Sequence, residues 1–255
     1  MTRRRPLVAG NWKLHRTVDE SVALARAIKH KLPREAAAEV MIAPVFTALW
    51  SVHEALGDES RVRLGAQNCH WEDEGAFTGE VSPPLLKDVG CEYVIAGHSE
   101  RRHVFGEGDE QVRRKVGALL SHGLLPVLCV GETLEQREAD ESERVVLAQW
   151  DAAVEGLSGE SLGRLVVAYE PVWAIGTGKT ASPADAQQMH AALRARVSAD
   201  FGDAAAQRLR ILYGGSVKPS NAGALLAQPD VDGALVGGAS LSADSFLSIV
   251  EAADA

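Results

Sequence analysis

Glu170 is a single carboxylate that stands where an apolar segment meets a loop containing glycines. Residues 165–169 are Leu-Val-Val-Ala-Tyr, a continuous apolar run that predicts a strand buried on both faces, as in parallel sheets. Pro171 has no N–H group and ends the ladder of that strand. The position suits a general base, with a structural charge at a strand end as the alternative.

The loop after Glu170 has the composition of a small lid. Trp173 and Ile175 are bulky enough to cover a small ligand, and Gly176 and Gly178 supply backbone freedom and N–H groups. Residues 176–180, Gly-Thr-Gly-Lys-Thr, resemble the end of a P-loop. That motif requires glycine five residues before Gly178, where this chain has Trp173, so the segment does not predict a nucleotide site.

Two further polar groups follow other apolar runs. Lys13 lies beside Asn11 at the end of the first run, and its ammonium would attract an anionic substrate. His98 ends the fourth run, where it can act as an acid or an electrophile. Glu100 is suited to orient Lys13 or His98, or simply to begin a helix. A surface lysine and a structural histidine are the alternatives when each residue is considered alone.

A phosphate site is predicted where the last two apolar runs end. Gly215 and Ser216 follow the seventh run and lead into a helix, and Gly237 and Gly238 follow the eighth. Glycines let an oxyanion approach the main chain, and a helix N-terminus adds partial positive charge. The alternative is tight packing between strand and helix, which also requires glycine.

The elements that must position these groups are short apolar runs that recur about every thirty residues. Amphipathic segments with helix-start residues lie between them, such as Thr17 with Glu20, Ser82-Pro83, Asp109 before Glu110, and Ser182-Pro183. The predicted strands are 7–10, 39–43, 63–67, 92–97, 125–130, 165–169, 209–213 and 232–236.

Eight alternations of strand and helix predict an α/β fold, a single (β/α)8 barrel with eight parallel strands, over residues 1–255 as one domain. An open doubly wound sheet is the alternative. The polar residues and glycines that follow nearly every strand favour the barrel, because in a barrel they all converge on one mouth. The chain shows no linker or low-complexity segment that would divide it.

Composition excludes several classes of protein. Hydrophobic residues make up 46%, but no apolar stretch approaches the roughly 20 residues of a membrane span. The net charge of −9 argues against nucleic acid as a partner. Arg3, Arg4 and Arg5 precede an apolar segment that is too short for a secretory signal.

The cysteines and histidines predict neither disulfides nor a metal site. Cys69, Cys91 and Cys129 are odd in number and widely spaced, which favours a reducing cytoplasm. His98 and His103 are five residues apart, the wrong spacing for two ligands on one helical face. A carboxylate, an imidazole, an ammonium and a phosphate site, without metal or cofactor, suit proton transfer next to a carbonyl. The predicted reaction is aldose–ketose isomerisation of a phosphorylated substrate.

Eight segments in order over nearly the whole chain resemble the triosephosphate isomerase family. They are Asn11-Trp12-Lys13, Gln67-Asn68, residues 75–80, residues 97–102, Cys129-Val130-Gly131-Glu132, residues 170–179, residues 213–217 and Gly237-Gly238. The resemblance implies a cofactor-independent, cytoplasmic enzyme of glycolysis and gluconeogenesis that interconverts dihydroxyacetone phosphate and D-glyceraldehyde 3-phosphate. It assigns Glu170 as the base, His98 as a neutral electrophile and Lys13 as the third catalytic residue.

The same resemblance implies further contacts. The implied substrate-binding residues are Asn11, Lys13, Gly176, Ser216, Gly237 and Gly238. The loop containing Phe77 and Thr78 would insert into a partner subunit near its Lys13, which implies a homodimer. The sequence departs from the family pattern at Leu14 and Val45, and neither position carries a proposed catalytic group.

Two rival functions remain at this stage. Another phosphosugar isomerase on the same barrel would share the phosphate site but not the set of Lys13, His98 and Glu170. A barrel that only binds a sugar phosphate or a protein partner would not need Glu170 or His98, and this chain has both.

Overall fold

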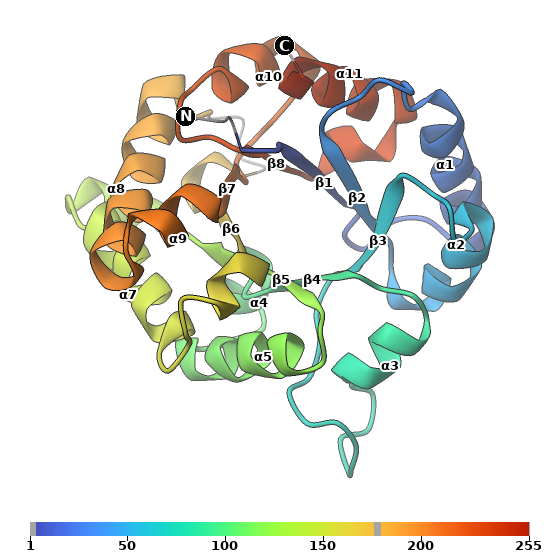
Figure 1. Ribbon diagram of the computed structural model, residues 1–255, viewed down its shortest axis with the longest axis horizontal. Helices are drawn as coiled ribbons and strands as arrows, with labels where there is room; N and C mark the ends of the chain where they lie inside the picture. The colour runs from blue at the N-terminus through green and yellow to red at the C-terminus, as the bar shows by residue number, and fades with distance from the viewer. Residues whose placement is uncertain (1–3, 176–179, 255) are drawn as a thin grey trace.

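The computed structural model describes residues 4–175 and 180–254. Its eight strands are all parallel and form a closed barrel in sequence order, which confirms the predicted fold (Figure 1). The strands are β1 (Leu7–Asn11), β2 (Glu39–Ala43), β3 (Val62–Ala66), β4 (Tyr93–Ala96), β5 (Leu125–Val130), β6 (Val166–Tyr169), β7 (Arg210–Tyr213) and β8 (Gly233–Val236). The barrel closes because β1 pairs with β8, with Leu7 opposite Gly233, so the open-sheet alternative is wrong.

Helices surround the barrel as an outer ring (Figure 1). They are α1 (Val18–Lys31), α2 (Leu49–Leu56), α3 (Pro83–Asp88), α4 (Ser99–His103), α5 (Asp109–Ser121), α6 (Leu134–Glu138), α7 (Ser142–Val154), α8 (Pro183–Phe201), α9 (Asp203–Arg208), α10 (Pro219–Leu226) and α11 (Ala243–Asp254). Within the described residues, short 3₁₀ helices are η1 (Phe46–Ala48), η2 (Ser161–Arg164), η3 (Val172–Ala174) and η4 (Gly238–Leu241).

The predicted helix starts agree with the structure except at one residue. The Thr17 N–H donates to Glu20 Oε2 at 2.8 Å, and Ser182 Oγ accepts the Asp185 N–H at 3.1 Å. Both bonds satisfy N–H groups that the first helical turn leaves unpaired. Helix α5 begins at Asp109 itself, because its capping residue is Gly108.

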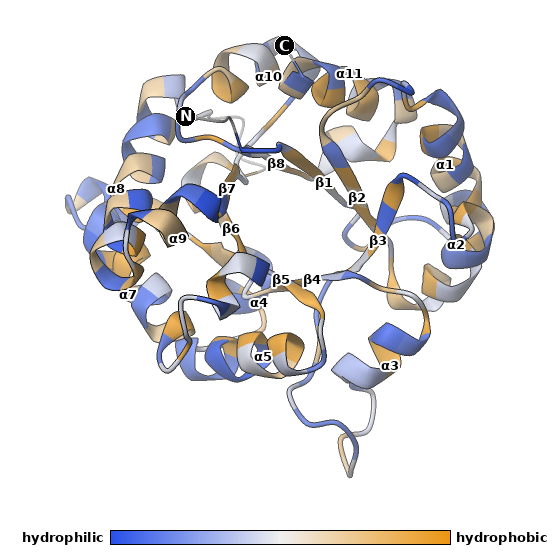
Figure 2. Cartoon of the chain, in the orientation of Figure 1, coloured by the Kyte–Doolittle hydropathy of each residue, from blue (hydrophilic) through white to orange (hydrophobic). Residues whose placement is uncertain are grey.

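Alternate strand residues form two separate apolar layers. Leu7 and Ala9 belong to the cluster inside the barrel, whereas Val8 belongs to the larger cluster between strands and helices. This alternation follows from the two-residue period of a strand. Figure 2 shows the strands as mostly apolar and the helices as apolar mainly on one side. The strands are therefore buried on both faces, as predicted from the sequence.

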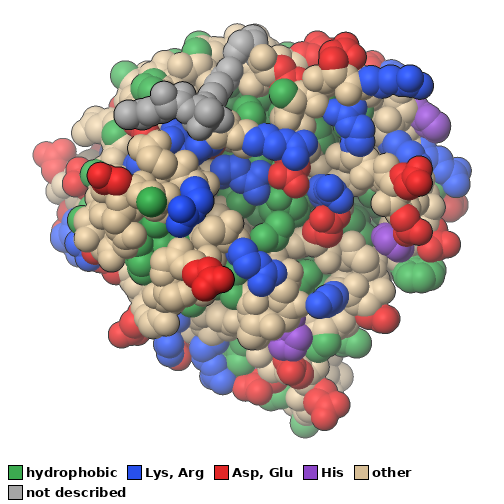
Figure 3. Space-filling model, in the orientation of Figure 1, with side chains coloured by type: hydrophobic (Ala, Val, Ile, Leu, Met, Phe, Trp, Pro, Cys, Tyr) green, Lys and Arg blue, Asp and Glu red, His purple; other side chains and the backbone are tan. Residues whose placement is uncertain are grey.

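Charged side chains gather near the middle of the face on which the N-terminus lies (Figures 1 and 3). At the amino ends of the strands, Arg210 NH1 contacts Glu39 Oε2 at 2.6 Å, and Arg63 NH1 contacts Glu92 Oε1 at 3.1 Å. Arg210 NH2 also donates to the Tyr93 hydroxyl at 3.0 Å. These pairs cover one end of the barrel interior and leave the carboxyl ends of the strands for the candidate site.

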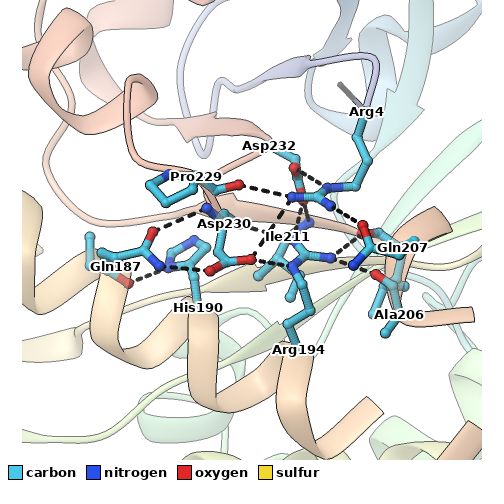
Figure 4. A network of polar contacts seen from close by, with 12 residues as sticks. Arg4, Gln187, His190, Arg194, Ala206, Gln207, Ile211, Pro229, Asp230 and Asp232 are labelled. Atoms are coloured by element: carbon cyan, nitrogen blue, oxygen red, sulfur yellow. Dashed lines mark hydrogen bonds and ion pairs between the residues drawn. The ribbon is translucent and has the colours of Figure 1, made fainter. Parts of the chain in front are cut away.

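A buried polar network joins α8 to the segments beside β7 and β8 (Figure 4). Arg194 donates to Asp230 Oδ1 and Asp232 Oδ2, both at 2.6 Å, and its NH1 donates to the carbonyls of Ala206 and Leu209. Asp232 Oδ2 also accepts the N–H of Ile211 at 2.8 Å. One guanidinium therefore connects α8, α9 and two strands.

We expect Arg194→Gln to lower the free energy of unfolding by about 3–5 kcal/mol, because it removes the guanidinium that pairs with both Asp230 and Asp232 and leaves Arg4 as their remaining cationic partner. The network lies at the amino ends of the strands, so kcat of the folded protein should be unchanged. Urea unfolding at fixed protein concentration measures the loss. The control is Lys31→Gln, which breaks the exposed pair with Asp244 and should change little. Equal stabilities of the two variants would contradict the structural role.

Candidate active site

A cavity of about 680 Å³ opens at the carboxyl ends of the strands. It is lined by Asn11, Lys13, His98, Glu170, Ile175, Gly214, Gly215, Ser216, Val217, Lys218, Pro219, Ser220, Leu235, Gly237, Gly238, Ala239 and Ser245. The predicted site residues therefore meet at one mouth, apart from Gly176, which lies outside the described residues. Residues from β1, β4, β6, β7 and β8 reach the same space only because the sheet closes.

Glycines on the neighbouring strands make room for Glu170. A Cβ atom on Gly131, which follows β5, would lie only 1.8 Å from the Glu170 carbonyl oxygen. A Cβ atom on Gly214, which follows β7, would lie 2.8 Å from Glu170 Cγ. The Glu170 N–H also donates to the Val130 carbonyl at 2.8 Å. Glu170 is thus held closely between two strand ends.

The Glu170 carboxylate is buried and fully partnered. Its Oε2 accepts the Ser99 N–H at 2.9 Å, and its Oε1 lies 3.0 Å from His98 Nε2. Burial alone raises the pKa of Glu170, but His98 and the Ser99 N–H lower it by more, so the net pKa lies below the ordinary value. The carboxylate is consequently ionised at neutral pH and able to accept a proton.

His98 lies at the N-terminus of α4, and its ring is held from both sides. Its Nδ1 accepts the Glu100 N–H at 3.2 Å, and its Nε2 faces Glu170. Burial lowers the pKa of His98, but the Glu170 carboxylate raises it by more, so the net pKa lies above the ordinary value, which favours the charged ring. The hydrogen bond at Nδ1 opposes this and decides the protonation state. An unprotonated Nδ1 is needed to accept the Glu100 N–H, so we assign the neutral ring with its proton on Nε2.

Lys13 has a backbone conformation that is unusual for a residue with a side chain. Its φ is +52°, in the left-handed region. The Lys13 N–H donates to Asn11 Oδ1 at 3.0 Å, and Gln67 Nε2 donates to the Lys13 carbonyl at 2.9 Å. Its Nζ lies 2.6 Å from Glu100 Oε1. These contacts hold the strained residue with its ammonium at the cavity, a pattern found at functional sites.

Glu100 therefore combines the roles that the sequence left open. Its carboxylate binds Lys13, its N–H binds His98, and it lies in the first turn of α4. A single residue fixes the relation between the ammonium and the imidazole.

The opposite side of the cavity is formed by backbone. Gly215 and Ser216 lead to α10, Gly237 directly precedes η4, and Gly238 is the first residue of η4. The N–H groups of Gly215 and Ser216 donate to no other residue within the described chain. A Cβ atom on Gly237 would lie 3.4 Å from Lys13 Cε, so the lysine stem passes close to this glycine. Unpaired N–H groups beside an ammonium suit a phosphate group.

A second cavity of about 680 Å³ lies on the other side of Lys13. We call it the socket. It is lined by Asn11, Lys13, Leu14, His15, Arg16, Thr17, Glu20, Val45, Phe46, Thr47, Gln67, Asn68, His98, Glu100, Arg101 and Phe105. The two positions that depart from the family pattern, Leu14 and Val45, both line it. The socket and the active-site cavity thus share Asn11, Lys13 and His98.

The segment between β3 and α3 projects away from the barrel (Figure 1). Phe77 in this loop remains 44% exposed, although its ring lies 4.4 Å from that of His70. An exposed aromatic side chain on a projecting loop is typical of an interaction surface.

Sequence reasoning missed two groups that hold Glu170 and its neighbours in place. No role was predicted for Ser99, but its N–H, after the end of β4, donates to the Glu170 carboxylate after the end of β6. Glu132 Oε1 accepts from the Tyr169 hydroxyl at 3.0 Å and from Trp173 Nε1 at 2.8 Å, which anchors the residues on both sides of Glu170. Their position after a strand was the only available signal.

Cys69, Cys91 and Cys129 are buried and form no disulfide. Among residues 4–175 and 180–254, no cluster of three or more His, Cys, Asp or Glu side chains is arranged to bind a metal ion. No helix within these ranges is long and apolar enough to span a bilayer.

Comparisons with known proteins agree with this geometry. The family model described as triosephosphate isomerase matches residues 6–253. A triosephosphate isomerase of Roseiflexus castenholzii is 55% identical over 247 residues, which cover 97% of each chain. One from Symbiobacterium thermophilum is 55% identical over 253 residues, covering 98% of this chain and 97% of the relative. One from Chloroflexus aurantiacus is 55% identical over 247 residues, covering 97% of this chain and 98% of the relative.

Proposed function

This chain belongs to the triosephosphate isomerase family, and on that basis we propose that it interconverts dihydroxyacetone phosphate and D-glyceraldehyde 3-phosphate. The observation that carries the proposal is the pairing of Glu170 Oε1 with His98 Nε2 at 3.0 Å, beside Lys13, in the cavity at the barrel mouth. A carboxylate base and an imidazole donor at this separation can act on adjacent atoms of one substrate. Neither group requires a metal or a cofactor for this reaction.

Glu170 removes a proton from C1 of dihydroxyacetone phosphate, and the released electron pair forms the C1–C2 double bond. Charge develops on the oxygen of C2, to which His98 Nε2–H donates. The ring then transfers a proton between the two oxygens, and Glu170 returns its proton to C2, which leaves the aldehyde at C1. Each proton is returned, so the overall reaction is an isomerisation.

Lys13 binds the developing enediolate charge, and the backbone on the opposite side of the cavity binds the phosphate. The Lys13 ammonium neutralises the developing enediolate, and Asn11 holds Lys13 through its backbone N–H. The phosphate binds at Ser216, Gly237 and Gly238. Gly176, outside the described residues, would add an N–H group from a lid formed by residues 171–179. This division of roles fits a substrate with a reactive end and an anionic end.

The rival functions do not account for the site as well. A barrel that only binds sugar phosphate gains nothing from a buried Glu170 held against His98, because burying a charged group is costly. Another phosphosugar isomerase on the same barrel would share the phosphate site but would use a different set of acid and base. The combination of Lys13, His98 and Glu170 is what separates these functions.

The test is a coupled assay in which dihydroxyacetone phosphate formed from D-glyceraldehyde 3-phosphate is reduced by an auxiliary dehydrogenase. We expect turnover that is unchanged by EDTA and that shows no need for added cofactor. A longer phosphosugar such as ribose 5-phosphate serves as the control substrate and should not react. Turnover of the pentose alone would contradict the proposal.

The proposed unit is a cytoplasmic homodimer in which residues 1–255 of each chain form one domain. The loop around Phe77 and Thr78 would enter the socket of the other subunit, next to the partner subunit's Lys13. The size of the socket, its position beside Lys13 and the exposed Phe77 support this arrangement. Active-site geometry would then depend on association.

We expect Thr78→Arg to weaken the dimer and reduce activity, because the larger charged side chain would overfill the socket and displace Lys13. Light scattering and activity measured over a dilution series would report both effects. Ala204→Arg, at an exposed position of α9 that lines neither cavity, is the matched control. A fully active wild-type monomer would end this hypothesis.

A further inference from the structure

Arg102 lies in α4, one helical turn after His98, and its side chain faces neither cavity. Its Nε donates to the Gly97 carbonyl at 2.9 Å, and its NH2 donates to the Cys129 carbonyl at 3.3 Å. Its backbone N–H donates to the His98 carbonyl at 3.1 Å. The Arg102 side chain is 8% exposed, and its charge is paired with Asp109 through a 2.6 Å contact from NH1. Arg102 therefore binds the main chain on both sides of His98.

The conformation of Gly97 explains why the main chain needs support here. Its φ is +71°, so the chain turns sharply between the end of β4 and His98. A Cβ atom on Gly97 would lie 3.0 Å from Val112 and 3.1 Å from Arg102 NH2, which shows how closely the guanidinium packs against this turn. The direction of the His98 side chain is set by this peptide, because the ring is attached one residue later.

The Cys129 carbonyl connects Arg102 to β5, the strand beside Glu170. Cys129 precedes Val130, whose carbonyl accepts the Glu170 N–H at 2.8 Å. The guanidinium thus bridges the turn that carries His98 and the strand end to which Glu170 is hydrogen-bonded. Arginine suits this position because its planar fork donates in two directions at once, which the single ammonium of lysine cannot do at these separations.

We propose that Arg102 is a positioning residue that holds the His98 ring at its working distance from Glu170. The proposal rests on the isomerase function inferred above. Arg102 lines neither the active-site cavity nor the socket, so it acts on the substrate only through His98. Small displacements of a catalytic group have large effects on rate, because proton donation requires close and aligned partners.

The first test is Arg102→Lys, which keeps the charge and the contact with Asp109 but loses one of the two carbonyl bonds. We expect kcat to fall about 10- to 100-fold with little change in KM, because His98 acts on the developing oxyanion more than on bound substrate. The control is Asp109→Asn, which removes the charged partner of Arg102 and leaves both carbonyl bonds in place. It should lower the melting temperature without lowering kcat.

A double-mutant cycle with His98→Gln tests whether Arg102 acts through the histidine. If it does, Arg102→Lys will have almost no further effect on kcat once His98 has been replaced. Effects of the two substitutions that multiply would overturn the proposal, as would an unchanged kcat in Arg102→Lys. A fall in melting temperature alone, matched by Asp109→Asn, would show a purely structural role.

A measurement that does not depend on turnover separates this proposal from the proposed function. The ¹⁵N NMR signals of the His98 ring report its tautomer and the hydrogen bond from Glu100 to Nδ1. We expect these signals to shift in Arg102→Lys and to remain unchanged in Asp109→Asn. Absence of isomerase activity in the wild type would overturn the function, whereas unchanged ring signals in Arg102→Lys would overturn the role of Arg102.

Discussion

Glu170→Gln is expected to lower kcat by about 10²- to 10⁴-fold or more, because an amide cannot accept the proton from carbon. The amide also has only one oxygen for the two donors that face it, the Ser99 N–H and His98 Nε2–H. The fold should survive, since Gln has nearly the same shape and removes a buried charge. The coupled assay measures the loss, and circular dichroism and light scattering check fold and association.

Glu132→Gln is the matched control for this prediction. Glu132 is also a buried carboxylate at a strand end, but it binds Tyr169 and Trp173 and does not line the cavity. Its replacement should cost much less activity than that of Glu170. A Glu170→Gln enzyme within tenfold of the wild type, purified from a host that lacks its own isomerase, would exclude Glu170 as the base.

Lys13→Ala is expected to impair KM and kcat together. The ammonium binds a dianionic substrate in the ground state and stabilises the enediolate in the transition state, so KM should rise and kcat should fall. Loss of an electrostatic stabiliser of this kind typically lowers kcat by about 10²- to 10³-fold. The left-handed backbone at Lys13 is retained by Asn11 and Gln67, whose contacts do not involve the deleted side chain.

Salt dependence supplies a second measurement for Lys13. In a protein of net charge −9, attraction of the substrate relies on local positive potential, so the wild-type KM should rise with ionic strength. This dependence should be weaker in Lys13→Ala. Lys31→Ala removes an exposed lysine outside both cavities and should leave kcat and KM as they are. Unchanged kcat/KM in Lys13→Ala would exclude the electrostatic role.

The order of the elements and the end of the barrel at which the site lies were both predictable from local sequence. Short apolar runs alternated with capped amphipathic segments, and this pattern depends on neighbouring residues only. Each predicted strand lies within one residue of the observed one at its start. Because parallel strands present their carboxyl ends at one mouth, the positions of Lys13, His98 and Glu170 followed once closure was assumed.

The contacts that make these residues work depend on tertiary structure. Ser99 and Glu170 are 71 residues apart, and no local pattern indicates that the N–H of one binds the carboxylate of the other. The sequence alone gives no sign that Arg102 differs from a surface charge on a short helix. In the structure its side chain is buried against two strand ends.

The left-handed conformation of Lys13 was likewise absent from the sequence pattern, because lysine has no intrinsic preference for it. It is held by Gln67, which directly follows β3 and donates to the Lys13 carbonyl, and by Asn11, which accepts the Lys13 N–H. Closure of the barrel brings strand ends that are distant in the chain within hydrogen-bonding distance, and long-range hydrogen bonds between them decide the conformations of Lys13, His98 and Glu170. The sequence by itself determined which groups reach the mouth, and the packing of neighbouring strand ends determined their orientation and charge state.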